Sequence, residues 1–470
     1  MRRFLRFLGT RRYLYVREKG ENMAAKTQGI SAKQLSEMSK DYNADRANLL
    51  AANAAFKSGI MEAATDYRAA GKLPFSFNVD LKQGKITDQK SSGRCWIFSA
   101  LNTFRYEIIK KYKLENFELS QNYMFFYDKL EKANYYLESI LKTVDEPLDG
   151  RLYWFINFDP LCDGGQWDML VNLVNKYGVV PKEAFPDAKG AEASRWFVQY
   201  LSTKLREDAM ILRELSKGGA KPAELQKKKA EMLNEFYRML CISLGEPPKS
   251  FDLCLRDKDD KVIQEFGITP QEFFNKYVGL KLDDYVSVIH SPTKDKPYGK
   301  MFTVKFLGNV AEGRPVSYLN LEMDRIKKAV IRQLKDGHPV WFGSDCTKFG
   351  ARKEGIFDRD TAAVEKLFNV NFNFTKEQSL VYGDSMMNHA MVILGVNLDA
   401  KGKPDRWRIE NSWGKDAGHD GYYVASDSWF DDYVYQVAVN KKYLDAAAKK
   451  LIGQKLIELE PWDPFGPLAD

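Results

Sequence analysis

Three short motifs contain the side chains that acyl transfer through a thiol requires. They are Gln89-x5-Cys95-Trp96, Asn388-His389-Ala390 and Glu410-Asn411-Ser412-Trp413-Gly414. Taken singly, a cysteine is most often a buried thiol, a histidine at a strand start a hydrogen-bonded polar group, and Asn-Ser before Gly a turn. Their combination in one chain instead favours nucleophilic catalysis, with Cys95 as the nucleophile.

Each motif would supply one part of such a reaction. A thiol with a pKa near ~8.5 is only a few per cent ionised at neutral pH. A helix N-terminus and a protonated His389 beside Cys95 would favour the thiolate and lower this pKa to ~4. Asn411 would hold the imidazole in the productive tautomer, and Trp413 would cover the pair from water. The amide of Gln89 and the backbone N–H of Cys95 would form an oxyanion hole, in which one donor is typically worth ~3 to 4 kcal/mol.

Hydrophobic spacing predicts the elements that must position these groups. A helix is expected to begin at Cys95, because apolar residues recur three and four positions apart after it. After residue 283, short apolar runs predict strands. The expected strands are 285–289, 302–306, 340–343, 389–396, 407–410 and 421–425, with one helix over 323–334 between them.

These patterns predict an α+β fold with two lobes that face one cleft. The five predicted parts are a basic, disordered extension (1–30), a helical lobe with the nucleophile (31–190), an inserted charge-rich helical hairpin (191–283), a β-rich lobe with the histidine and asparagine (284–457) and an extended C-terminal tail (458–470). The tail contains three prolines, so it cannot continue a helix.

Composition narrows the class of protein. The 470 residues are 44% hydrophobic and 29% charged, which is typical of a globular protein, and no apolar run approaches the ~18 to 20 residues of a membrane helix. The net charge is +7, but residues 1–22 alone contribute +5 from seven basic and two acidic side chains. The rest of the chain therefore has no excess of charge that would favour nucleic acid.

The basic N-terminal stretch and the cysteines bear on location. Arginines interrupt the apolar residues of the first 22 positions, so we expect no secretion signal there. An Arg-rich transit peptide, although short of Ser, and a translation start at Met23 are the two alternatives. The five cysteines are sparse and odd in number, with no Cys-x-x-Cys pair. This favours a reducing, cytoplasmic location and argues against a zinc site.

Several of these motifs, in this order, resemble the papain-like cysteine peptidases, and more closely their branch of bleomycin hydrolase and aminopeptidase C. The matching segments are Gln89…Gly93-Arg94-Cys95-Trp96…Ser99, Cys162-Asp163-Gly164-Gly165-Gln166-Trp167, 176–181, His389-Ala390, Asn411-Ser412-Trp413-Gly414 and Glu460-Pro461-Trp462-Asp463-Pro464. The resemblance implies a papain-like fold and a cysteine aminopeptidase without a cofactor or metal. Ser92 stands where secreted relatives have a disulfide cysteine, which agrees with a cytoplasmic enzyme.

The resemblance also implies roles for individual residues. The catalytic ones are Cys95 as nucleophile, His389 as general acid and base, Asn411 as the orienting group and Gln89 as the oxyanion donor. The substrate-binding ones are Gly164, Gly165, Ala469 and Asp470. The C-terminal arm is expected in the cleft, where its carboxylate would meet the free amino terminus of a peptide substrate. This chain has an additional Asp470, which the enzyme would either trim or use as a second anion.

The family further implies a homohexamer, in which the hairpin at 191–283 acts as an oligomerisation arm. Two other functions remain open. One is a different Cys-His acyl transferase, such as a glutaminase or transglutaminase, although Asn411 and the spacing from Gln89 to Cys95 favour peptide hydrolysis. The other is nucleic-acid binding, as the main or a secondary role, through the basic segment 1–22.

Overall fold

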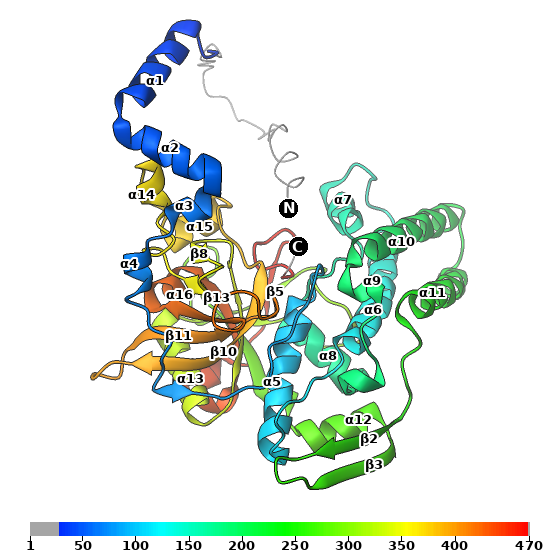
Figure 1. Cartoon of the computed structure of the whole chain (residues 1–470). Helices are drawn as coiled ribbons and strands as arrows, with labels where there is room; N and C mark the ends of the chain where they lie inside the picture. Colours follow the sequence, from blue (N-terminus) through cyan, green and yellow to red (C-terminus); the bar gives the residue numbers. More distant parts are fainter. Residues whose placement is uncertain (1–27, 469–470) are drawn as a thin grey trace. The chain divides into compact units, whose positions relative to one another are not determined.

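The computed structural model describes residues 28–468 of the chain (Figure 1). Most of the predicted extension at 1–30 therefore lies outside the described residues, as do Ala469 and Asp470. The chain divides into two compact units, residues 1–57 and 58–470. In the first unit, Ser31 caps helix α1 (Ala32–Ala44) with its side chain, and helix α2 (Arg46–Ser58) runs up to the boundary. All of the candidate site residues belong to the second unit.

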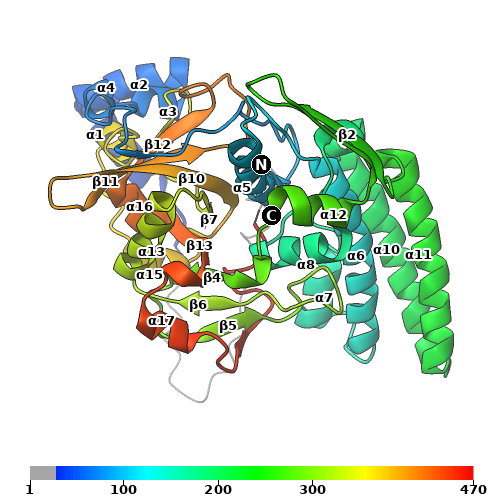
Figure 2. The ribbon, with the colours of Figure 1, turned by 90° about the horizontal axis from the view of Figure 1, so that it is seen from below.

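The first half of the second unit consists mainly of helices, as the apolar spacing predicted. Helix α5 (Cys95–Tyr112) begins at the predicted residue and is buried on nearly all sides, because helices pack on one side of it and strand β10 on the other (Figures 1 and 2). The helices around it are α6 (Gln121–Lys142), α7 (Arg151–Phe158), α8 (Trp167–Tyr177) and α9 (Lys189–Glu192). Shorter helices α3 (Ile60–Ala64) and α4 (Tyr67–Ala70) precede them.

The predicted helical hairpin is formed by α10 (Ser194–Lys217) and α11 (Pro222–Leu244), which lie side by side in Figure 2. Pro222 occupies the first turn of α11, where its missing N–H costs no hydrogen bond. The segment after the hairpin also contains two antiparallel strands that the sequence analysis missed. They are β2 (Phe251–Arg256) and β3 (Val262–Ile268), followed by α12 (Pro270–Phe273) and the short helical turns η3 (Phe274–Val278) and η4 (Leu282–Asp284).

The second half is built on one large mixed sheet, whose strand order is β14-β5-β6-β4-β13-β7-β10-β11-β12-β9-β8, with β1 also paired to β10. The strands are β1 (Val79–Asp80), β4 (Tyr285–Ile289), β5 (Met301–Val304), β6 (Tyr318–Asn320), β7 (Val340–Ser344), β8 (Gly350–Ala351), β9 (Ile356–Phe357), β10 (His389–Leu398), β11 (Pro404–Glu410), β12 (Tyr422–Ser426), β13 (Val434–Asn440) and β14 (Ile457–Leu459). The helices of this half are α13 (Met323–Lys335), α14 (Val364–Phe368), α15 (Lys376–Val381), α16 (Asp427–Tyr433) and α17 (Ala446–Leu451), with the short turn η5 (Lys441–Tyr443). The short turn η2 (Lys182–Ala184) belongs to the first half, between α8 and α9.

Most of the predicted strands are present in this sheet, including the two that carry His389 and precede Asn411. The predicted strands agree with β4, β5, β7, β10, β11 and β12 to within a few residues. Strand β13 was missed, although it runs between β4 and β7 near the middle of the sheet. Its sequence Val-Tyr-Gln-Val-Ala-Val is rich in β-branched residues, which is the signal that could have identified it.

Within residues 28–468, no helix is long and apolar enough to cross a membrane.

Candidate active site

The thiol of Cys95 lies at the first residue of α5 and is completely buried. The backbone N–H of Ala390 donates to Cys95 Sγ over 3.4 Å. Since Ala390 follows His389 at the start of β10, this contact brings the histidine strand directly against the thiol of Cys95. Two segments nearly 300 residues apart in the sequence therefore meet at the sulfur atom.

His389 and Asn411 form a hydrogen-bonded pair. The distance from His389 Nε2 to Asn411 Oδ1 is 2.9 Å, and the backbone N–H of Ser412 donates to the same oxygen over 2.8 Å. Because an amide oxygen only accepts, Nε2 must carry the ring proton in neutral His389. Nδ1 is then the ring nitrogen that can accept a proton, as a general base requires.

The indole of Trp413 covers this pair. Its ring stacks on the imidazole of His389 with centroids 4.8 Å apart, and the Arg352 guanidinium lies 4.3 Å from the indole centroid on a cation–π contact. His389 is 5% exposed and Asn411 is 1% exposed. Water is therefore largely excluded from their hydrogen bond, which strengthens it electrostatically.

A buried ion pair fixes Asn411 relative to α5. Arg105, three turns into α5, contacts the carboxylate of Glu410 over 2.5 Å, and both side chains are almost inaccessible to solvent. Gln83 donates to the other carboxylate oxygen over 3.1 Å. Glu410 precedes Asn411 directly, so the pair sets the position of the asparagine with respect to the helix that carries the nucleophile.

Burial acts on the two titratable groups in opposite directions. Burial raises the pKa of the Cys95 thiol to about 12, although the nearby N–H groups of Ala390, Trp96 and Cys95 favour the thiolate. Burial also lowers the pKa of His389 to about 4, against the hydrogen bond to Asn411. Desolvation is the cause of both shifts, and it favours the neutral thiol and the neutral imidazole. The low thiol pKa expected from the sequence requires the positive charge of a protonated His389 beside Cys95, which would act against this desolvation.

Gln89 belongs to a segment that pairs with the asparagine loop. The backbone N–H of Gln89 donates to the carbonyl of Ser412, and that of Gly414 donates to the carbonyl of Thr87. The side-chain oxygen of Gln89 accepts from Ser412 Oγ over 2.6 Å, and its Nε2 donates to the Ser92 carbonyl over 2.7 Å. Gln89 Nε2 carries a second N–H, so these contacts orient the amide without using its whole donor capacity.

Gly164 and Gly165 lie on the helical side of the site. A Cβ atom on Gly165 would lie 2.6 Å from the indole of Trp96, so only glycine fits next to the residue that follows the nucleophile. The backbone of Gly165 pairs with Leu468 as an isolated antiparallel bridge, in which the Leu468 N–H donates to the Gly165 carbonyl over 3.2 Å. Gly165 thus presents an edge on which an extended chain can lie.

The C-terminal arm occupies this edge. Leu468 is fully buried, and the carbonyl of Gly466 accepts from Gln166 Nε2 over 2.6 Å. A Cβ atom on Gly343 would lie 3.3 Å from both Leu468 Cδ2 and Met387 Sδ, so the absence of a side chain there leaves room for the leucine. The predicted contacts of Ala469 and Asp470 fall outside the described residues.

The sequence was compared with known protein families, and residues 29–466 match the model of the Peptidase C1-like family. The chain belongs to this family. It is 47% identical to the Aminopeptidase C of Streptococcus thermophilus over 91% of this chain and 96% of that protein. It is 44% identical to the Aminopeptidase C of Listeria monocytogenes over 94% of this chain and 99% of that protein.

A solved structure also resembles this Peptidase C1-like chain. The crystal structure of PepW from Lactobacillus rhamnosis superimposes with a TM-score of 0.91 at 46% identity, covering 93% of this chain and 98% of that one. The α+β, two-lobe papain-like fold predicted from the sequence is therefore confirmed.

One group of residues around the site of this Peptidase C1-like chain was missed by the sequence analysis. Lys129 and Lys132 of α6 donate to the carbonyls of Cys162 over 2.7 and 2.8 Å, and Lys132 also donates to that of Gly164 over 2.5 Å. Asp163 pairs with Lys129 over 2.8 Å and accepts from the backbone N–H of Gly93. Burial raises the pKa of Asp163, but Lys129 together with the hydrogen bonds from Ser194 and the Gly93 N–H lowers it to about 2. The spacing of two lysines three residues apart on a helix was the available signal.

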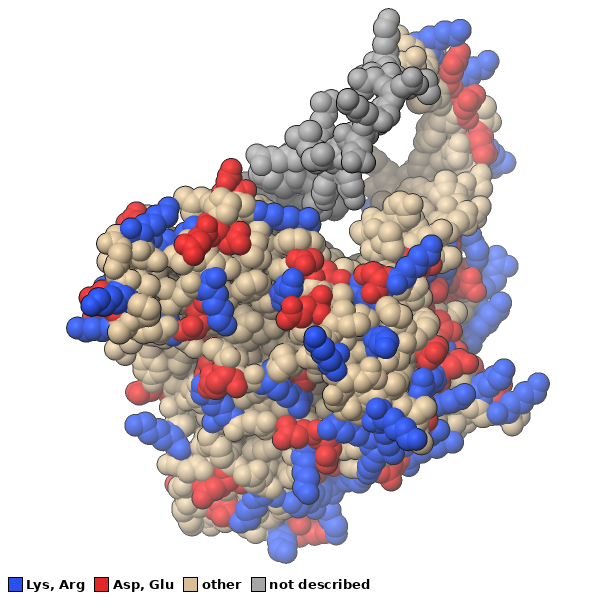
Figure 3. Space-filling view, turned by 180° about the vertical axis from the view of Figure 1, so that it is seen from behind, with Lys and Arg blue, Asp and Glu red and all other residues tan. Residues whose placement is uncertain are grey.

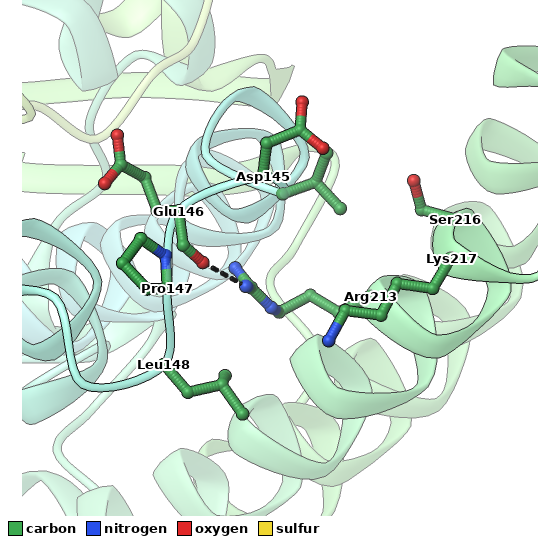
Figure 4. Close-up of a pocket in the computed structure, with 8 residues that line it drawn as sticks. Asp145, Glu146, Pro147, Leu148, Arg213, Ser216 and Lys217 are labelled. Carbon is green, nitrogen blue, oxygen red and sulfur yellow. Dashed lines mark hydrogen bonds between the residues drawn. The ribbon is translucent and has the colours of Figure 1, made fainter.

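Other features of the described chain lie apart from this site. A pocket of about 240 Å³ lies between the loop after α6 and the end of α10, where Arg213 donates to the carbonyl of Glu146 (Figure 4). No catalytic candidate lines it. Residues 28–468 contain no group of three His, Cys, Asp or Glu side chains arranged to hold a metal ion. On the face in Figure 3, acidic and basic side chains are interspersed.

Proposed function

We propose that this chain is a cysteine aminopeptidase that removes residues from the free amino terminus of peptides. The observation that carries the proposal is the contact between Leu468 and Gly165, because it places the chain's own arm along the edge beside a buried nucleophile. Membership of the Peptidase C1-like family and the likeness to proteins named Aminopeptidase C support the same activity. Asn411 as the partner of His389 supports peptide hydrolysis rather than another acyl transfer.

The reaction uses a Cys-His-Asn mechanism. Cys95 Sγ attacks the carbonyl carbon of the first substrate residue, while its proton passes to His389 Nδ1. The second N–H of Gln89 and the backbone N–H of Cys95 stabilise the oxyanion. His389 then gives its proton to the leaving amine as the C–N bond breaks. Water attacks the thioester, His389 takes up a proton from it, and the C–S bond breaks to release the amino acid and the thiol.

The arm restricts which peptides can bind. A carboxylate at the end of the arm would pair with the α-ammonium of a substrate's first residue, and the arm itself would block residues before it. Ala469 and Asp470 are the candidates for this contact. The mass of the purified active chain, compared with that of an inactive variant, tells whether the enzyme trims Asp470 or keeps it for this contact.

A substrate panel tests this function. We expect hydrolysis of aminoacyl-arylamides with free amino groups, at least about tenfold slower hydrolysis of the same compounds after N-acetylation, and no release of ammonia from glutamine. A thiol-directed epoxide should label one cysteine and stop the hydrolysis in proportion. Ammonia release from glutamine without arylamide hydrolysis would instead identify a different acyl transferase.

We also propose a cytoplasmic location. Cys95, Cys241, Cys254 and Cys346 are free thiols, and Cys254 is exposed. Free accessible thiols persist in a reducing compartment, whereas they tend to oxidise outside it. Nucleic-acid binding through segment 1–22 stays a prediction of a secondary role, and this segment lies outside the described residues.

Self-association through the helical side is the third part of the proposal. Four large aromatic side chains on α7 and α10 are 50 to 63% exposed, namely Trp154, Phe158, Trp196 and Tyr200. Arg206 of α10 donates to the carbonyls of Asn157 and Phe158, so the two helices are neighbours. Exposed aromatic groups of this size are typical of protein interfaces, and a second copy of this chain would cover them.

Light scattering tests the assembly. We expect a mass about six times the 54.0 kDa of one chain. The double variant Trp196→Glu/Tyr200→Glu should lower that mass, because two charges would be buried without partners. Tyr67→Glu is the control, since it changes an exposed aromatic residue on α4, outside the segment 191–283. A mass near that of one chain for the unaltered protein would exclude the hexamer.

A further inference from the structure

The arm is held along its length by three kinds of contact. It leaves the sheet after β14, which pairs in parallel with β5. Near its end, Phe465 is 1% exposed between the rings of Tyr318 and Tyr435, and its carbonyl accepts from Tyr318 Oη over 2.9 Å. Between these two points, one buried ion pair joins the arm to the rest of the unit.

This ion pair joins Asp463 of the arm to Lys296. Lys296 Nζ lies 2.8 Å from Asp463 Oδ2, and the two side chains are only 3% and 10% exposed. Asp295, which is 62% exposed, is the second partner of Lys296 at 2.6 Å. The ammonium also lies 5.8 Å from the ring centroid of Phe465. Lys296 therefore contacts the arm in two ways, through its ion pair with Asp463 and through the ring of Phe465.

Asp463 transmits this contact to the backbone of the arm. Its Oδ1 accepts from the N–H of Phe465 over 3.0 Å, and its carbonyl accepts from the N–H of Gly466 over 3.1 Å. One carboxylate thus shapes the turn with one oxygen and binds Lys296 with the other. Gly466 and Leu468, which contact the cleft, follow this turn directly.

The position of Lys296 is itself fixed by the sheet. Its carbonyl accepts from Asn320 Nδ2 over 2.6 Å, and the same amide group donates to the Ser291 carbonyl over 2.8 Å. Asn320 is completely buried at the end of β6. The ammonium is therefore presented from a rigid loop, so it can define where the arm lies.

Packing alone holds residues 458–464 weakly. A cavity of about 400 Å³ lies beside them, lined by Lys296, Asp463 and Trp462 among others. The guanidinium carbon of Arg151 lies 3.7 Å from the ring centroid of Trp462. Because open space flanks this stretch, the buried charge pair is the contact whose loss would free it most.

We propose that Lys296 is a positioning residue that keeps the arm in the cleft and thereby limits cleavage to free amino termini. The proposal rests on the proposed aminopeptidase function and adds the residue that enforces it. Removal of the ammonium leaves the Asp463 carboxylate buried without its cation, so the turn must move toward water. The arm then spends time outside the cleft, and peptides with blocked amino termini gain access.

The experiment compares rates on an N-acetylated peptide and the same peptide with a free amino group. For Lys296→Met we expect the ratio of blocked to free cleavage to rise at least about tenfold. Asp463→Asn, which keeps an acceptor for the Phe465 N–H, should give a similar rise. The double variant should resemble either single one, because both remove the same interaction.

Lys305→Met is the matched control. Lys305 also pairs with the arm, at 3.0 Å from Glu460, but its side chain is 38% exposed and that of Glu460 is 54% exposed. Such an exposed pair contributes little, so the ratio should not change. Equal epoxide labelling of all variants ensures that the nucleophile is intact.

The outcomes separate this proposal from the function on which it rests. If deletion of residues 467–470 raises the ratio but Lys296→Met does not, Lys296 does not position the arm. If neither changes the ratio, the arm does not restrict the substrate and the proposed aminopeptidase specificity fails as well. An equal rise for Lys305→Met would also overturn the assignment to Lys296.

Discussion

Cys95→Ala is expected to lower kcat for amino-acid release by about 10⁴-fold or more, because it removes the sulfur atom that we propose as the nucleophile. The side chain removed is small, and α5 keeps its contacts with the sheet, so the fold should persist. Labelling by a thiol-directed epoxide should disappear together with the activity. The measurements are the rate on a free aminoacyl-arylamide and the mass of the labelled protein.

Cys241→Ala is the control for this result. Cys241 is half-buried on α11, away from the nucleophile helix, and its loss should alter neither the rate nor the labelling of Cys95. Undiminished hydrolysis by Cys95→Ala would refute the proposed mechanism. Persistent labelling with lost activity would show that the epoxide reports another thiol.

Deletion of residues 467–470 should convert the enzyme from removal of terminal residues toward cleavage within peptides. The deletion removes Leu468, whose N–H occupies the carbonyl of Gly165 and whose side chain fills the space next to Gly343. An extended substrate could then continue along the same edge past the nucleophile. We expect the ratio of blocked to free peptide cleavage to increase by about 100-fold, which corresponds to ~2.7 kcal/mol of lost discrimination.

Leu468→Ala provides an intermediate for comparison. It preserves the backbone hydrogen bond to Gly165 but removes the buried side chain, so a smaller increase is expected. The readout is mass spectrometry of the fragments from one peptide, with and without acetylation. An unchanged preference after the four-residue deletion would mean that the arm has no part in specificity.

The catalytic motifs could be found from the sequence because each lies at the start or end of a regular element. Cys95 begins α5 and His389 begins β10, and both boundaries follow from apolar spacing. Asn411 follows β11 in the same way. The contact between Cys95 and Ala390 was not derivable from spacing, because it depends on how α5 packs on the sheet.

Other features depend on tertiary contacts that leave no local pattern. The lysines that hold the carbonyls of residues 161–164 read as ordinary helix-surface charges, yet Lys129 and Lys132 are buried. The Lys296–Asp463 pair joins residues 167 positions apart, and nothing near Lys296 in the sequence marks it as the partner of Asp463. Desolvation of the Cys95 thiol, which raises its pKa, is likewise a property of the assembled site that spacing does not reveal.

The pairing of Thr87–Gln89 with Ser412–Gly414 has a consequence for biosynthesis. The two segments are more than 300 residues apart, and together they orient the amide of Gln89. A ribosome that has made the first 400 residues has exposed the thiol but neither the partner of the histidine nor the strand that aligns the amide. Because the segment 412–414 is made last, the amide of Gln89 cannot take this orientation until translation has passed residue 414.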